Sequence, residues 1–253
     1  MAAVDEGFGK LTKLLFGKEL GLVADYEEWL NQRMDVGRVG KSCLTGKRIY
    51  IPNYAVFKTF PEQRIAGLDS LRELSERKIG VGENDGLREI AKKAGEINYY
   101  IVEFIEGENV DVTDSVLYQN LAHSDKTIDC WNGKYLAYDF FSDKSEFFFG
   151  CYRVFECKFC VHCYNSKYLT RCFEMESCYN CSDSMFCHNC ENVRDSLFCS
   201  NVKNKRYAVM NAEVGREAYL KLKAMLVEGI AESLEKKKRF EPDIFGVGCK
   251  SIT

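Results

Sequence analysis

Several features that mark common enzyme classes are missing from the sequence. Only three histidines occur among 253 residues. There is no G-x-S-x-G elbow, no H-E-x-x-H zinc motif and no dinucleotide-type glycine fingerprint. Paired carboxylates such as Glu27 and Glu28 are typical of a solvated surface. Because no catalytic constellation emerges from these residues, we expect a protein that is not an enzyme.

Long apolar runs and a strong net charge are missing as well. The first twenty residues include Asp5 and Glu6 and never sustain the apolar run that a signal peptide or a membrane span requires. The formal net charge is −3, so the overall balance does not favour a polyanion as partner. We therefore expect a cytoplasmic protein, or one carried in a virion, that does not act at a membrane.

A phosphate-binding loop is suggested by residues 35–47, DVGRVGKSCLTGK, but two observations argue against it. Gly40, Lys41 and Ser42 match the end of the pattern G-x-x-x-x-G-K-[ST], whereas Asp35 stands where its first glycine belongs. The motif must also follow a buried strand and open a helix. Here the upstream residues are helix-like and the downstream residues have strand composition. We expect a glycine-rich turn that enters a strand.

Helical periodicity marks both ends of the chain. Residues 8–34 form two amphipathic pieces joined near Gly21, and the C-terminal residues 213–240 carry apolar side chains at helical spacing, Met225 among them. Between these ends, the spacing predicts helices over 61–80 and 85–95, after a short strand-like stretch.

Cysteine is the residue that the sequence has in excess. The chain holds thirteen, an odd number that disulfides alone cannot pair within one chain, and without a secretion signal we expect them to be reduced. From Cys151 to Cys199 all ten are separated by multiples of three, for which random placement has odds of about one in 20,000. The other positions in this register are small or apolar: Val154, Ser166, Leu169, Met175, Ser184, Val193, Ser196 and Val202.

A strict period of three fits neither a helix nor a half-buried strand. It fits a solenoid in which one residue in three faces a narrow interior. A second period of nine, doubling to eighteen, predicts coils of nine or eighteen residues; it is carried by Cys163, Cys172, Cys181, Cys190 and Cys199. The register extends back to about Val110, and terminal elements must cap such an array.

The sequence therefore predicts an α+β chain in which a cysteine-rich β-solenoid is flanked by N-terminal helices and a C-terminal capping helix. The predicted divisions are a helical segment (1–40), a small α/β region (41–105), the solenoid (106–211) and the capping helix with its tail (212–253).

Three roles are open for the inward thiols. They can pack as small apolar residues, or form disulfides, since coils about 4.8 Å apart bring Cα atoms within disulfide range. The C-x-x-C spacings in CKFCVHC and CHNC are also typical of zinc sites. The candidate metal ligands are Cys157, Cys160, Cys163, Cys178, Cys181, Cys187 and Cys190. His162 and His188 fall outside the register, so we expect them to be exposed and not to be ligands.

Two further sets of residues have both a functional and a structural interpretation. His123 and Cys130 could form a nucleophilic pair, but the register places only the cysteine inside, which favours a structural role. The basic run Lys236–Arg239 could contact phosphates, with Tyr164, Tyr168 and Tyr179 stacking on bases. Cations at the end of a helix also complement its dipole, and we favour that interpretation.

Aromatic residues recur between the cysteines. We expect them to form ladders on an outer face of the solenoid, either for protein contacts or beneath the helices. They are Phe155, Phe159, Tyr164, Tyr168 and Phe173.

Two short elements resemble a known group of sequences. The closing signature N-x-[KR]-N-K-x-Y-x-x-x-N is matched by Asn201, Lys203, Asn204, Lys205, Tyr207 and Asn211, and an earlier T-G-K element by Cys43, Thr45, Gly46 and Lys47. With the cysteine array between them, the chain resembles largely uncharacterised cysteine-rich proteins predicted in candidate-phylum bacteria and viral genomes. Residues 61–100 are not clearly part of this likeness, and the second cysteine of the first element is absent. The resemblance implies a shared fold and supplies no activity.

These observations together predict a non-enzymatic structural or protein-interaction scaffold, as a component of a viral or cellular assembly. A zinc-dependent nucleic-acid-binding protein is the first alternative, and zinc is the one cofactor that the spacing suggests. A thiol-based enzyme is the second. A protein partner or self-assembly is favoured over nucleic acid.

Overall fold

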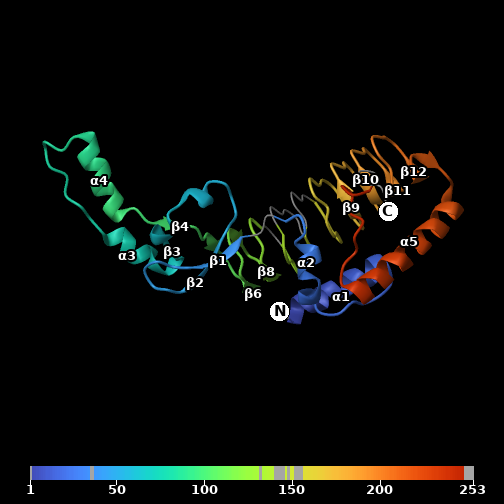
Figure 1. The fold of residues 1–253 in the computed structure, drawn as a ribbon, viewed down its shortest axis with the longest axis horizontal. Helices are drawn as coiled ribbons and strands as arrows, with labels where there is room; N and C mark the ends of the chain where they lie inside the picture. The colour runs from blue at the N-terminus through green and yellow to red at the C-terminus, as the bar shows by residue number, and fades with distance from the viewer. Residues whose placement is uncertain are drawn as a thin grey trace. The chain divides into compact units, whose positions relative to one another are not determined.

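The computed structural model describes residues 2–34, 37–130, 133–139, 146, 149–150 and 156–247. The chain divides into two compact units (Figure 1). One unit combines Met1–Val36 with Glu106–Thr253, and the other is Gly37–Ile105. The N-terminal helices thus belong to the same unit as the predicted solenoid, and the predicted α/β region of residues 41–105 makes up most of the other.

The cysteine-rich region is a β-solenoid, as the sequence predicted. Its parallel ladders join residues that are twelve positions apart, such as Phe173 with Met185 and Val110 with Ala122. The predicted coil length of nine or eighteen residues is therefore wrong, since one coil takes twelve. The strands of the coils are β5 (Ile105–Glu106), β6 (Val110–Thr113), β7 (Tyr118–Gln119), β8 (Ala122–Asp125), β9 (Phe173–Glu176), β10 (Met185–His188), β11 (Arg194–Leu197) and β12 (Arg206–Val209).

The period of three arises from the backbone. Every third residue from Glu174 to Met210 has a φ between 47° and 57°, in the left-handed region. Each such residue turns the chain at a corner, so a coil of twelve residues has four sides. Asparagine and aspartate tolerate this conformation better than other side-chain-bearing residues do. They occupy many of the corners: Asn180, Asp183, Asn189, Asn192, Asp195, Asn201 and Asn204.

The cysteine spacing of nine has a separate cause. The residue that follows each left-handed corner points inward, and its neighbour in the next coil lies twelve positions later. The inward residue nine positions later follows the preceding corner of that next coil, and it is the diagonal neighbour of the first residue. The Sγ atom of Cys178 accordingly lies 3.2 Å from the carbonyl oxygen of Cys187, and that of Cys190 lies 3.4 Å from the carbonyl of Cys199. The sequence period of nine therefore reports a diagonal contact inside the solenoid. The register positions Cys151 and Val154 lie outside the described residues.

One side of the solenoid carries mostly apolar residues in successive coils and lies under helices, except at the last coil. We call it the covered face, and its outward residues are Ala137, Tyr138, Phe149, Val161, His162, Phe173, Glu174, Met185, Phe186, Leu197, Phe198, Val209 and Met210. The predicted N-terminal helical pieces are present, and their aromatic rings pack here. Phe8 lies 5.1 Å from Phe149 between ring centroids, and Phe16 lies 5.1 Å from Phe173.

The helices on this face flank the solenoid along its side (Figure 1). They are α1 (Ala2–Phe16), the 3-10 turn η1 (Val23–Tyr26), α2 (Glu27–Leu30) and α5 (Arg216–Lys237). The C-terminal end of the solenoid is closed by β13 (Ala212–Glu213), which pairs antiparallel with β12. Lys205 occupies an interior position of the last coil, where a charge disfavours stacking of another coil.

The second unit is small. An antiparallel hairpin of β1 (Arg38–Lys41) and β2 (Arg48–Ile51) packs beside the parallel pair β3 (Ile65–Ala66) and β4 (Tyr100–Ile101), around a core that includes Val102. The predicted helix over 61–80 is mostly absent, because Ile65 enters a strand. The other elements of this unit are η2 (Phe57–Thr59), η3 (Glu62–Arg64), η4 (Leu68–Ser70), α3 (Leu71–Glu76) and α4 (Leu87–Ile97). Among all the helices described, none has the length and apolarity that crossing a membrane needs.

A buried carboxyl group at the start of the covered face predicts a pH effect. Asp125 is 4% exposed, and burial raises its pKa from 3.8 to about 6; nearby Asp114 and Glu27 act in the same direction, and Lys126 opposes them. The folded protein then holds this proton more tightly than the unfolded chain does. This contribution to stability is therefore full below about pH 4 and is lost as the pH rises through about 6. Asp125→Asn should raise the free energy of unfolding at pH 7 by roughly 1–2 kcal/mol. Urea titrations between pH 4 and 7 check this, and an unchanged pH profile in the variant would contradict it.

Candidate functional site

The solenoid interior is lined by free thiols. In the described part of the chain ten of the cysteines are buried and Cys43 is exposed. One contact recurs along the array, in which a thiol lies near the backbone carbonyl two residues earlier; it is made by Cys163, Cys178, Cys187, Cys190 and Cys199. Cys190 Sγ is 3.2 Å from the oxygen of His188, and the Ser184 hydroxyl makes the same bond at 3.0 Å to Ser182. Cysteine and serine can therefore occupy equivalent positions in the register, because each is small and each can donate to this carbonyl.

Hydrogen bonding and burial shift the pKa values of the interior thiols in both directions. Burial, with Cys181 and Cys160 nearby, raises the pKa of the Cys172 thiol well above its ordinary value. Hydrogen bonds with Cys190 and Cys199, together with burial, raise the pKa of Cys187. A protonated thiol donates a hydrogen bond but is a poor nucleophile and a poor metal ligand. The same hydrogen bonds lower the pKa of their acceptors, that of Cys190 to about 3 and that of Cys199 to about 7. Burial of the thiols and their contacts with backbone carbonyls, rather than their pKa values, support a structural role for the array.

One substitution pair tests this role. Cys187 Sγ lies 3.5 Å from the carbonyl oxygen of Met185 and 3.7 Å from that of Ser196. Cys187→Ala removes the donor and leaves a cavity, so the free energy of unfolding should fall by about 1–3 kcal/mol. Cys187→Ser keeps a donor and should remain within about 1 kcal/mol of the unsubstituted protein. Equal losses in denaturant titrations of the two variants would contradict the hydrogen-bond interpretation.

The seven predicted metal ligands all lie inside the solenoid. Cys157, Cys160, Cys163, Cys178, Cys181, Cys187 and Cys190 are each buried. Among the residues with described positions, no group of three or more His, Cys, Asp or Glu side chains is placed to hold a metal ion.

Bound zinc remains a prediction, which elemental analysis of the purified protein would test. We expect the ten buried thiols to react with a disulfide reagent only after unfolding. Stoichiometric zinc, with thiols released by a chelator, would instead establish a metal site.

The two histidines near the cysteine motifs have different environments. His188 is exposed, as predicted. The prediction that His162 is exposed is wrong, because this residue belongs to the covered face and is 2% exposed. Its ring lies 4.9 Å from that of Trp29, and its Nδ1 lies 2.6 Å from Glu174 Oε1. Glu174 Oε2 accepts a hydrogen bond from the backbone N–H of Ile244 at 2.8 Å. The pair therefore links the solenoid to α2 and the C-terminal tail.

The predicted aromatic ladder is largely covered. Phe173 and Tyr164 are buried and Phe159 is partly buried, so burial beneath the helices explains these three residues. Tyr168 is 44% exposed. Phe155 lies outside the described residues.

The alternative nucleophilic pair is not assembled in the described fold. Cys130 is buried in the interior, where its Sγ lies 3.9 Å from Asp139 Oδ2. His123 lies at an outer position, 3.4 Å from Asp111 Oδ2, and stacks on Tyr135. The structure therefore places these two side chains on opposite sides of the solenoid wall.

The basic run at the end of α5 is engaged with carboxylates. Lys236 lies 3.2 Å from Glu232, and Arg239 lies 3.1 Å from Glu241. The N–H of Lys238 bonds the carbonyl of Leu234 and ends the helix in a left-handed residue. These contacts fit the interpretation that the cations stabilise the helix terminus.

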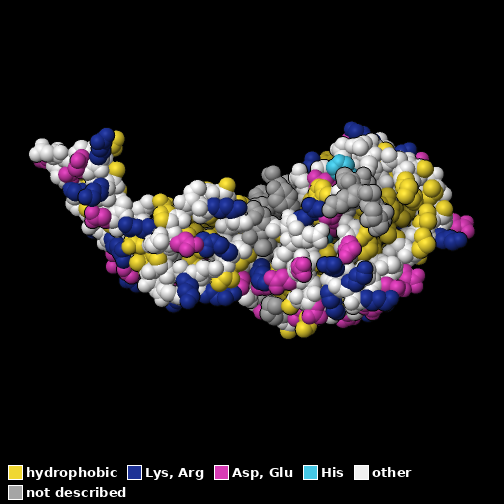
Figure 2. Space-filling view, viewed as in Figure 1, with side chains coloured by type: hydrophobic (Ala, Val, Ile, Leu, Met, Phe, Trp, Pro, Cys, Tyr) yellow, Lys and Arg dark blue, Asp and Glu magenta, His cyan; other side chains and the backbone are white. Residues whose placement is uncertain are grey.

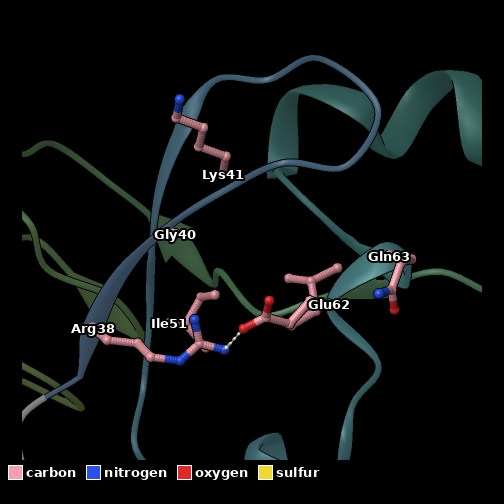
Figure 3. Close-up of a pocket in the computed structure, with 7 residues that line it drawn as sticks. Arg38, Gly40, Lys41, Ile51, Glu62 and Gln63 are labelled. Carbon is pink, nitrogen blue, oxygen red and sulfur yellow. Dashed lines mark ion pairs between the residues drawn. The ribbon is translucent and has the colours of Figure 1, made fainter.

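The residues that suggested a phosphate loop line a shallow pocket of about 330 Å³ in the second unit (Figure 3). Gly40 and Lys41 lie in β1 and a turn follows them, so they do not open a helix as a phosphate loop requires. Arg38 pairs with Glu62 at 2.9 Å across it, and the Lys41 ammonium points away from that pair (Figure 3). The pocket therefore lacks the geometry of a phosphate loop. Asp35 lies outside the described residues.

An apolar groove of about 460 Å³ lies between the last coils and α5. Met210 is 74% exposed and Met225 is 66% exposed beside it. Figure 2 shows hydrophobic side chains gathered where β12 and α5 lie. The groove is lined by Leu197, Phe198, Val209, Met210, Leu222, Met225, Leu226, Gly229, Ile230 and Phe240. The sequence analysis identified the helical spacing of the apolar residues in α5 but did not show which of them are left uncovered.

Comparisons with known protein families, with curated proteins and with solved structures found no match for the chain.

Proposed function

We propose that the protein is a non-enzymatic interaction scaffold and that its apolar groove receives an amphipathic helix of a partner protein. The observation that carries this proposal is the open end of the covered face. Phe173, Phe186 and Leu197 are at most 1% exposed on that face, whereas Met210, one coil beyond Phe198, is 74% exposed. An apolar surface that continues a packed interface and then lies open is typical of a docking site.

The walls of the groove favour a helix as the occupant. One wall is the solenoid face, on which α1 and α5 of the chain already lie. The other wall is α5, whose groove residues from Leu222 to Ile230 recur at spacings of three and four. An apolar stripe at the same spacing complements such a wall. Met210 and Met225 can adapt to different apolar side chains because methionine is unbranched and flexible.

The setting that we propose is a viral or cellular assembly, in the cytoplasm or in a virion. The resemblance to cysteine-rich proteins of candidate-phylum bacteria and viruses supports this setting. Burial of the interior thiols, with their contacts to backbone carbonyls, supports a structural role over a catalytic one.

Site-specific photo-crosslinking tests the proposal. A photoreactive residue at Leu226, in the groove, is compared with one at Asn192, on an exposed corner. After irradiation in cells, the crosslinked peptides are identified by mass spectrometry. The proposal expects crosslinks from Leu226 to a segment with apolar residues at helical spacing, and far fewer from Asn192. Equal labelling from both positions, or crosslinks from the groove to polar segments only, would contradict it.

A further inference from the structure

Helix α4 of the second unit has an apolar stripe that the other described residues of this unit leave exposed. None of its eleven residues is buried, and Leu87 is 83% exposed. Ile90 and Ile97 are 38% and 36% exposed, and with Ala94 they follow Leu87 at spacings of three, four and three. A helix of this length is marginal in water and is normally held by packing of its apolar face. Within the described residues that face has no partner.

The described residues thus include two complementary features, the exposed apolar stripe of α4 and the open apolar groove. From Leu87 to Ile97 the stripe extends about 15 Å, at 1.5 Å per residue. The α5 wall of the groove, from Leu222 to Ile230, extends about 12 Å by the same measure. Both surfaces present aliphatic side chains at helical spacing, and charged residues of α4, such as Lys92, occupy its other face.

Resting on the proposed function, we infer that the occupant of the groove is α4 of a second copy of this chain. Such an interface joins two different surfaces, so each added copy brings one free helix and one free groove. Interfaces of this kind extend into open chains unless their rotation closes a ring. End-to-end stacking of solenoids is a poorer route to assembly, because β13 closes the last coil and Lys205 occupies its interior position.

Sedimentation velocity of the full-length protein tests the inference through two variants. The helix variant carries Leu87→Glu and Ile90→Glu, and the groove variant carries Met210→Glu and Met225→Glu. All four side chains are exposed, so circular dichroism should show both variants folded. The unsubstituted protein should increase in mean mass between about 1 and 100 µM, since an interface of this size binds weakly. Each variant alone should remain monomeric.

The mixture of the two variants is the decisive sample. Each retains the surface that the other has lost, so an equimolar mixture should form a dimer and grow no further. A Lys92→Glu variant, changed on the polar face of α4, should behave as the unsubstituted protein does. A mixture that remains monomeric, or variants that associate as strongly as the unsubstituted protein, would overturn the inference.

The failure of this inference is distinguishable from failure of the proposed function. If the unsubstituted protein is monomeric and its groove crosslinks to a helical segment of another protein, the inference that a second copy occupies the groove is wrong. The proposed scaffold function is then retained. Groove crosslinks to α4 within a concentration-independent monomer would overturn the inference in favour of docking within one chain. Loss of specific groove crosslinking altogether would overturn both.

Discussion

Replacing Phe173 with alanine is expected to lower the free energy of unfolding by about 3–5 kcal/mol, the usual cost of removing a buried phenylalanine. Its side chain is fully buried on the covered face. The ring lies 5.1 Å from Phe16, 5.4 Å from Phe186 and 6.3 Å from Phe240 between centroids. It therefore touches α1, the next coil and the tail at once, and its loss leaves a cavity that no single element can fill.

Tyr168→Ala provides the matched control for this variant. Tyr168 is an aromatic residue of the same array but is 44% exposed, so its removal should cost less than about 1 kcal/mol. Chemical denaturation of both variants, followed by circular dichroism, measures the difference. Similar losses for the two would show that the helices do not hold the covered face.

Glu174→Ala is expected to destabilise the protein by about 3–5 kcal/mol, because it removes one member of a buried charged or hydrogen-bonded pair. The carboxyl group accepts from the Ile244 N–H at 2.8 Å and lies 2.6 Å from His162 Nδ1. The substitution leaves the Ile244 N–H and His162 Nδ1 without this hydrogen-bond partner at buried positions. His162 would be the more affected, since its Nε2 already lacks a partner among the described atoms.

Glu174→Gln separates hydrogen bonding from charge. Glutamine keeps an acceptor for the Ile244 N–H and removes the ionisable group. Burial raises the pKa of Glu174, although the hydrogen bonds with His162 and the Ile244 N–H oppose this shift, so burying the charged form carries a desolvation cost that glutamine avoids. We expect Glu174→Gln to recover more than half of the stability lost in Glu174→Ala at pH 7. A glutamine variant as unstable as the alanine variant would show that the ionised pair with His162 is required.

The solenoid could be predicted because its interior repeats every third residue, but the coil length could not be read from cysteine alone. The cysteines occupy inward positions directly after the corners. Diagonal contacts between them, such as Cys178 with Cys187, correspond to a period of nine. The coil length of twelve residues is visible instead in the outward residues of the covered face. There a large or apolar outward residue recurs once per coil: Phe149, Val161, Phe173, Met185, Leu197 and Val209.

The candidate site was harder to predict for a physical reason. An apolar stripe shows that a helix face avoids water, but the stripe does not show what covers it. Leu234 and Met225 belong to the same periodic pattern of α5, yet Leu234 is fully buried and Met225 is 66% exposed. His162 shows the converse, since an off-register position is buried when a helix lies over that side. Which residues are covered by other elements depends on the tertiary fold, and the local sequence does little to determine it.

The twelve-residue coil also limits how such a chain can change in length. A deletion of one or two residues would exchange inward and outward positions in everything that follows it. A deletion of three would keep thiols inside but rotate each later coil by one side, so that residues such as Phe186 would leave the helices. Only a change of twelve, or a multiple of it, preserves both the interior and the covered face. Insertions and deletions in this architecture are therefore confined to whole coils, and the length of the flanking helices sets how many coils they can cover.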